Sequence, residues 1–124
     1  MSDVRKPLLW IGSSKRDLDG LPDGVQDVFG FALDFAQRGL KHEAAKALSC
    51  FGGAGVLEVV ENDEGGTYRA VYTVKFAGAV YVLHVFQKKS KKGIATPQSD
   101  VKLIKARLKK AEEDWKARLK EQTK

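Results

Sequence analysis

Three strand-forming runs separated by glycine-containing turns constrain the fold of this chain most. They are VLEVVEN (residues 56–62), TYRAVYTVKF (67–76) and VYVLHVFQKK (80–89), with DEGG and AGA between them. Tight turns between runs of β-branched and aromatic residues favour antiparallel hairpins. We therefore predict a three-stranded antiparallel meander in the second half of the chain.

The segments before the meander indicate an edge strand and helices. Residues 6–14 (KPLLWIGSS) form a short apolar run after a proline, which favours an edge strand. Residues 14–21 are predicted to form a short helix that Ser13 or Ser14 caps. A second helix opens at Pro22–Asp23, with Gln26 in capping-box spacing, and ends at Gly39. One face of this second helix carries an apolar stripe of 3.6-residue period: Val25, Val28, Phe29, Ala32, Leu33 and Ala36.

Residues 42–51 (HEAAKALSCF) are predicted to add another helical turn, and a last helix follows the meander. Ser99–Asp100 offer a cap and a first-turn acid for this last helix. Its apolar stripe consists of Val101, Ile104, Leu108, Ala111, Trp115 and Leu119. The order strand, helices, meander, helix indicates an α+β fold. We expect one domain over residues 1–124, with residues 1–5 and 120–124 frayed.

Charge is distributed unevenly along the chain. The net charge of +6 divides into −4 for residues 1–66, with 7 Lys/Arg against 11 Asp/Glu, and +10 for residues 67–124, with 15 against 5. Such an asymmetry favours a polyanionic partner for the second half. A solvated, lysine-rich helix is the alternative for residues 102–124, but it does not explain the lysines that end the last strand.

Several classes of protein and site are disfavoured by the sequence. No apolar run approaches the roughly 20 residues that cross a bilayer, so we expect a cytoplasmic protein. The single cysteine, Cys50, excludes an internal disulfide and a cysteine-based zinc site, and we expect it to fill the core. His42 and His84 lie in no metal-ligand spacing, and we predict neither a metal nor another cofactor.

The meander brings basic residues to one end of the sheet. A hairpin centred near Gly78 places Arg69 opposite Lys88, within one residue, and Lys88 shares the face of His84 and Phe86. Like charges placed together destabilise a sheet, which favours a bound anion such as an RNA phosphate. The alternative, equally open at this point, is that these cations spread into solvent at a loop tip. The aromatic residues nearby either stack on bases or, more commonly, fill the core.

The quoted runs, together with the strand end LHVFQKKSKKG, the helix opening SDVKLIKARL and the helix end DFAQRG, resemble a known family. The chain is similar to the phage-derived, HigB-like branch of the RelE/ParE superfamily, the toxins of type II toxin–antitoxin pairs. The resemblance covers roughly residues 6–115. It implies a compact α+β fold whose antiparallel sheet carries an active surface.

The resemblance further implies ribosome-dependent cleavage of mRNA, in which a 2′-hydroxyl attacks the adjacent phosphate. By residue-to-residue correspondence it gives catalytic roles to Arg69 and Lys89, flanked by Lys88. We also predict RNA contacts from four further residues: Lys91, Lys92, Tyr68 and Lys75. The chain departs from the RelE pattern where it has Glu58, Glu61 and the segment GIAT (93–96). The proton-transfer group therefore stays open; a lysine of lowered pKa is one candidate.

Two other functions fit the same resemblance: a ParE-like inhibitor of DNA gyrase, and a catalytically inactive, phage-derived nucleic-acid-binding protein. A toxin of either kind implies a cognate antitoxin, typically a helix-turn-helix protein. The nuclease also implies the ribosome and mRNA as partners. Codon preference and oligomeric state do not follow from the sequence.

Overall fold

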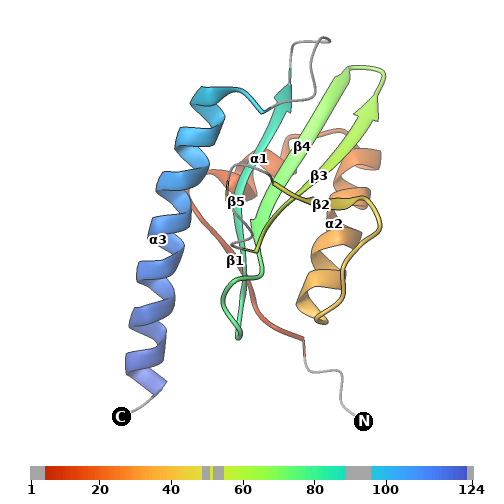
Figure 1. The fold of residues 1–124 in the computed structure, drawn as a ribbon. Coiled ribbons are helices and arrows are strands. Elements are labelled where there is room, and N and C mark those ends of the chain that lie inside the picture. The colour runs from red at the N-terminus through yellow and green to blue at the C-terminus, as the bar shows by residue number, and fades with distance from the viewer. Residues whose placement is uncertain (1–4, 49–50, 52–54, 89–95, 123–124) are drawn as a thin grey trace.

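The computed structural model describes residues 5–48, 51, 55–88 and 96–122, which form a five-stranded sheet with helices on both faces (Figure 1). The elements in chain order are β1 (Leu8–Trp10), α1 (Ser14–Asp19), α2 (Asp23–Gln37), β2 (Ala45–Ala47), β3 (Val56–Asp63), β4 (Gly66–Thr73), β5 (Val80–Lys88) and α3 (Gln98–Gln122). The strand order is β1-β5-β4-β3-β2. The predicted α+β class is confirmed.

The sheet contains the predicted meander, since β3 pairs antiparallel with β4 and β4 antiparallel with β5. The predicted N-terminal edge strand is also present. β1 lies at the sheet edge and pairs in parallel with the first part of β5, from Leu8 opposite Val80 to Trp10 opposite Val82. The chain reaches this parallel position because α1, α2, β2 and the first two meander strands intervene.

The other edge strand corrects the predicted helical turn at residues 42–51. Ala45–Ala47 instead form β2, which pairs antiparallel with β3 and places Ala45 opposite Val59. Ala45 and Val59 are both buried. Pairing with an existing strand therefore overrides the helix propensity of an alanine-rich segment, as tertiary context commonly does.

The helix ends agree with the predictions in part. α2 begins at Asp23, and Gly39 follows it in the left-handed conformation that favours glycine (φ 80°). The predicted capping box is wrong, because the Gln26 side chain donates to the carbonyl oxygens of Asp19 and Leu21. α3 continues through residues 120–122, which had been expected to fray.

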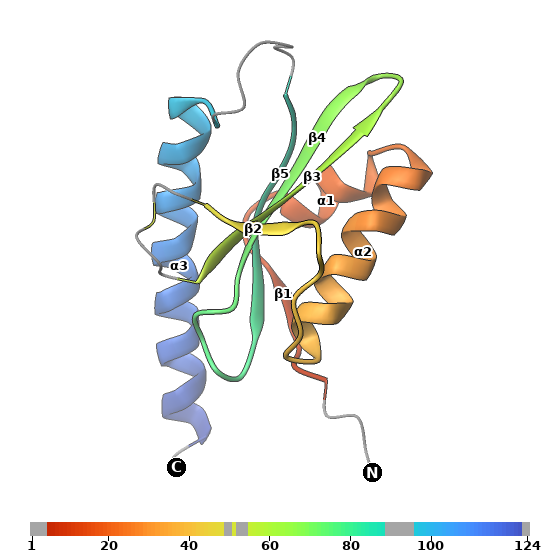
Figure 2. The same cartoon turned by 45° about the vertical axis from the view of Figure 1, so that its right-hand side comes forward.

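Two apolar clusters lie on opposite faces of the sheet. The buried stripe of α2, including Phe29 and Leu33, packs with Tyr68, Tyr72 and Val82 on one face. The other face carries Val71, Tyr81, Leu83, Phe86 and Phe51, and contacts Ile104, Leu108 and Ala111 of α3. The turned view in Figure 2 shows α3 and the α1–α2 pair on the two sides of the strands.

Candidate functional site

The predicted pairing of Arg69 with Lys88 is wrong by two residues. Arg69 lies opposite Phe86, and Lys88 lies opposite Thr67 at the end of the hairpin. On the turn side Thr73 lies opposite Tyr81, three residues from its predicted partner, and a register irregularity between Val71 and Tyr72 reduces this difference to two. The shift is even, so Arg69, Phe86 and Lys88 still share a face, as predicted.

Arg69 is buried on the α3 side of the sheet and forms an ion pair. Its Nη1 lies 2.9 Å from Oε2 of Glu58, and the two side chains are 5% and 12% exposed. Glu58 faces Val71 in the neighbouring strand, so it reaches Arg69 diagonally. The hydroxyl of Thr96 donates to the same carboxylate oxygen at 3.0 Å and lies 3.4 Å from Nη1 of Arg69. The guanidinium is therefore held in place by groups from β3 and from the segment before α3.

Beside this pair, β5 presents Lys88, Phe86 and His84 to the same face. Lys88 is buried, whereas Phe86 is half-exposed and stacks on His84 with ring centroids 4.4 Å apart and planes inclined by 15°. Nε2 of His84 lies 2.8 Å from a carboxylate oxygen of Asp100 in the first turn of α3. The packed position expected for His84 is thus observed, with Asp100 as its partner.

Other predicted site residues lie apart from Arg69. Tyr68 belongs to the apolar cluster on the α2 face, since neighbouring residues of a strand point to opposite sides. Lys75 lies beyond the other end of β4, exposed and 3.9 Å from Glu112. Lys89, Lys91 and Lys92 fall outside the described residues, as does Cys50, the expected core residue. The RNA contacts of Tyr68, Lys75, Lys91 and Lys92 and the catalytic role of Lys89 stay predictions.

The site contains three residues that sequence reasoning did not assign to it: Glu58, Thr96 and Phe86. Glu58 had been noted only as a departure from the RelE pattern, and Thr96 ends the divergent GIAT segment. Glu58 lies between apolar residues of β3, which is a signal that it has a partner, but only the register shows that this partner is Arg69. Thr96 offered no such pattern, because its contact depends on tertiary packing. Among the described residues no three His, Cys, Asp or Glu side chains gather as a metal site.

Comparison with known protein families finds a match over most of the chain. Residues 16–109 match the family described as phage derived protein Gp49-like. The chain belongs to this family. The phage-derived family expected from the sequence is confirmed by this match.

A solved structure confirms the RelE-like fold. A double arginine-to-alanine mutant of Escherichia coli toxin RelE in the free state is 18% identical, with a TM-score of 0.52 over 70% of this chain and 87% of that one. A chain of the toxin–antitoxin complex RelBE2 from Mycobacterium tuberculosis is 24% identical, with a TM-score of 0.47 over 72% of this chain and 98% of that one. The comparison with curated proteins finds no match. Within the part of the chain that the structure describes, no helix is long and apolar enough to span a bilayer.

Proposed function

We propose that the chain is the toxin of a type II toxin–antitoxin pair and cleaves mRNA on the ribosome, in the cytoplasm. Membership of a phage-derived family and the RelE-like fold support the toxin assignment. The observation that carries the nuclease assignment is the gathering of Arg69, Glu58 and Lys88 on one sheet face. The two cations can bind a phosphate, and the carboxylate can accept a proton. The cognate partner is an antitoxin of the helix-turn-helix class.

In this mechanism Arg69 binds the scissile phosphate. The guanidinium is buried and held by Glu58 and Thr96, so a phosphate reaches it by sharing or replacing those contacts. Stabilisation of the charge that develops on the phosphate oxygens then comes from Arg69 and from the ammonium group of Lys88. Because both groups are buried, water screens them less than it screens surface cations.

Glu58 supplies the base that the sequence left open. When a phosphate takes its place on Arg69, the carboxylate is released next to the reacting nucleotide and accepts the proton of the 2′-hydroxyl. The 2′-oxygen forms a bond to phosphorus, the bond from phosphorus to the 5′-oxygen breaks, and that oxygen takes a proton from Lys88. The products are a 2′,3′-cyclic phosphate and a 5′-hydroxyl.

Induction of the chain alone tests this proposal. We expect arrest of growth and of protein synthesis, with new mRNA ends that carry cyclic phosphates. The neutral pair Arg69→Gln with Glu58→Gln removes both charges together, which avoids leaving one of them buried alone. We expect this double variant to relieve the arrest, and Lys41→Gln, at an exposed lysine between α2 and β2, to leave it intact.

Two results would contradict the nuclease. DNA damage signalling with intact mRNA would instead favour the gyrase inhibitor, and RNA binding without cleavage or toxicity would favour the inactive phage-derived protein. Growth arrest that persists in the folded Arg69→Gln, Glu58→Gln variant would refute the assignment of these catalytic residues but not the assignment of the chain as a toxin.

A further inference from the structure

A pocket of about 420 Å³ lies between α1 and the second half of β5. Its lining residues are Arg16, Asp17, Gly20 and Leu21 on one side and His84, Val85, Phe86 and Gln87 on the other. We propose that this pocket binds one nucleobase of single-stranded RNA, next to the phosphate at Arg69. The inference rests on the proposed function and adds to it a subsite that selects the base.

One wall of the pocket includes a preformed aromatic platform. Phe86 stacks on His84 at 4.4 Å, and His84 is held by Asp100 at 2.8 Å. Arg107 donates to the carbonyl oxygen of Leu83 at 3.0 Å and lies 3.5 Å from Nδ1 of His84. The platform is therefore fixed before any ligand arrives, while Phe86 stays half-exposed. Unstacked bases of single-stranded RNA bind to such aromatic surfaces.

The opposite rim offers both a hydrogen-bond donor and an acceptor. Arg16 is exposed, and Asp17 is half-buried with its carboxylate accepting from the hydroxyl of Ser13 at 2.7 Å. A carboxylate accepts from the ring and exocyclic N–H groups of a base, and a guanidinium donates to its carbonyl oxygens or to a phosphate. The lining combines apolar side chains with polar and charged ones, and the volume lies within the roughly 300–1,000 Å³ of small-molecule sites, which fits a base.

The pocket and the Arg69 site share Phe86. This residue lines the pocket and lies directly opposite Arg69 in the β4–β5 pair. Side chains of directly opposed residues begin about 5 Å apart. A nucleotide whose phosphate reaches Arg69 therefore has its base within reach of the pocket.

A peptide strand is the competing class of ligand, because β1 stops pairing with β5 at Val82 and the pocket lies along the rest of that edge. Strand addition uses main-chain hydrogen bonds and needs neither the stacked pair nor Arg16 and Asp17. The aromatic platform and the shared Phe86 favour RNA.

The test uses short single-stranded RNA oligonucleotides with 2′-O-methyl groups, which cannot be cleaved by attack of a 2′-hydroxyl. Binding is measured by fluorescence anisotropy for sets that differ at one base. The wild-type chain should prefer one base, and Phe86→Leu should weaken binding about tenfold and remove the preference. Phe86→Tyr should retain both. Phe31→Leu replaces an exposed phenylalanine of α2 and is the matched control.

Asp17→Asn is a second probe, because an amide donates as well as accepts and should change which base is preferred. It decides the result if Phe86→Leu fails to fold. Unchanged affinity and preference in the folded variants would overturn the inference. NMR spectra offer a second way to overturn it. If RNA leaves the chemical shifts of Phe86 and Asp17 unchanged while the antitoxin changes them, the pocket does not bind RNA. If the chain shows the base preference but cuts no RNA, the proposed nuclease function is refuted while base binding in this pocket is supported.

Discussion

At the scale of single residues, Glu58 has two opposed effects in the proposed mechanism. It holds Arg69 ready at 2.9 Å, and it competes with the phosphate for the same guanidinium. Glu58→Gln keeps the shape and the hydrogen bonds but removes the charge. We expect RNA to bind more tightly, since the phosphate no longer displaces a carboxylate. Cleavage should fall about 100- to 10,000-fold, the usual effect of losing a general base.

These opposite changes distinguish a base from a structural residue. Loss of the ion pair should also lower the free energy of unfolding by about 3–5 kcal/mol, because the buried guanidinium of Arg69 keeps its charge while the side chain at position 58 loses its own. Affinity is measured with uncleavable RNA and cleavage with single-turnover kinetics. A Glu58→Gln chain that cuts at the wild-type rate would exclude Glu58 as the base.

The same residues show how far the sequence predicts the site. The face shared by Arg69 and Lys88 follows from strand alternation, which survives any even shift in register. The pairing itself does not follow, because β4 ends at Thr73 and β5 begins at Val80, so the connection is longer than the turn AGA. The irregularity between Val71 and Tyr72 then shifts the register again. Glu58 was visible as an acid in an apolar strand, but its partner was not, since a diagonal contact requires the register.

At the scale of elements, the turn between β4 and β5 packs under α3. A Cβ atom on Gly78 would clash with the indole ring of Trp115. Gly78→Ala should therefore displace Trp115 and lower the free energy of unfolding by about 1–3 kcal/mol. Gly30→Ala is the matched control, because nothing lies near its Cβ position and alanine should stabilise α2 by about 0.5–1 kcal/mol. Urea unfolding followed by fluorescence measures both, and equal stabilities would contradict the close packing.

A second contact between elements joins β5 to α3 and depends on pH. The hydroxyl of Tyr81 donates to Asp114 at 2.5 Å, which together with Arg118 lowers the pKa of Asp114 below its ordinary value of 3.8. Burial, with the bond to Asp114, raises the pKa of Tyr81 to about 12. The stabilisation from Asp114 is thus complete above about pH 3.8 and lost as the pH falls through the lowered pKa.

Tyr81→Phe should remove part of this dependence of stability on pH. We expect it to lower the free energy of unfolding at pH 7 by about 1 kcal/mol or less, because the Asp114 side chain is 42% exposed and water screens the contact. As the pH falls through the lowered pKa of Asp114, the variant and the wild type should converge in stability. Denaturant unfolding between pH 2 and 7 measures the difference in the free energy of unfolding. A difference that stays constant across this pH range would show that Asp114 does not contribute to the pH dependence through Tyr81.

Elements also differ in how well the sequence predicts them. α2 and the meander have strong periodicities and local turns, so they follow from the sequence. β2 does not, because three residues of alanine and lysine become a strand only when β3 is present to pair with them. The parallel pairing of β1 likewise depends on the position of β5 in the sheet, and β5 lies far from β1 in the sequence.

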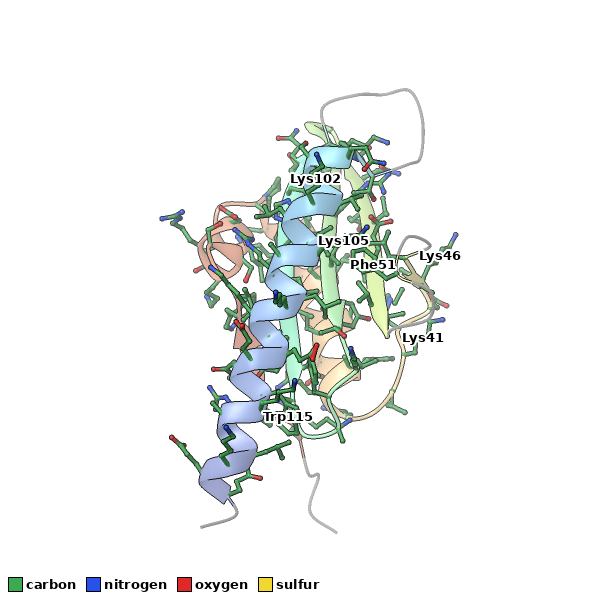
Figure 3. All side chains as sticks on the ribbon, turned by 60° about the vertical axis from the view of Figure 1, so that its left-hand side comes forward. Lys41, Lys46, Phe51, Lys102, Lys105 and Trp115 are labelled. Carbon is green, nitrogen blue, oxygen red and sulfur yellow. The ribbon has the colours of Figure 1, made fainter. Side chains whose placement is uncertain are left out.

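At the scale of the whole molecule, the positive charge of the second half extends from the strand end onto α3. Figure 3 shows Lys102 and Lys105 on the part of α3 near the site, with Phe51 and Lys46 in the same view. Phe51 belongs to the apolar cluster under this helix, and both α3 lysines are exposed. In the proposed mechanism RNA reaches Arg69 past these cations, so they should contribute through phosphate contacts rather than through base choice.

Charge reversal at Lys102 and Lys105 tests this extended surface. Because each contact with a single-stranded phosphate contributes about 0.7 to the slope of log affinity against log salt, the double variant should reduce that slope by roughly one. Affinity should fall equally for all sequences. The same reversal at Lys116 and Lys120, further along α3 near its C-terminal end, is the matched control and should change the slope less. Equal effects of the two pairs would mean that the helix attracts RNA through its total charge alone, with no path leading to Arg69.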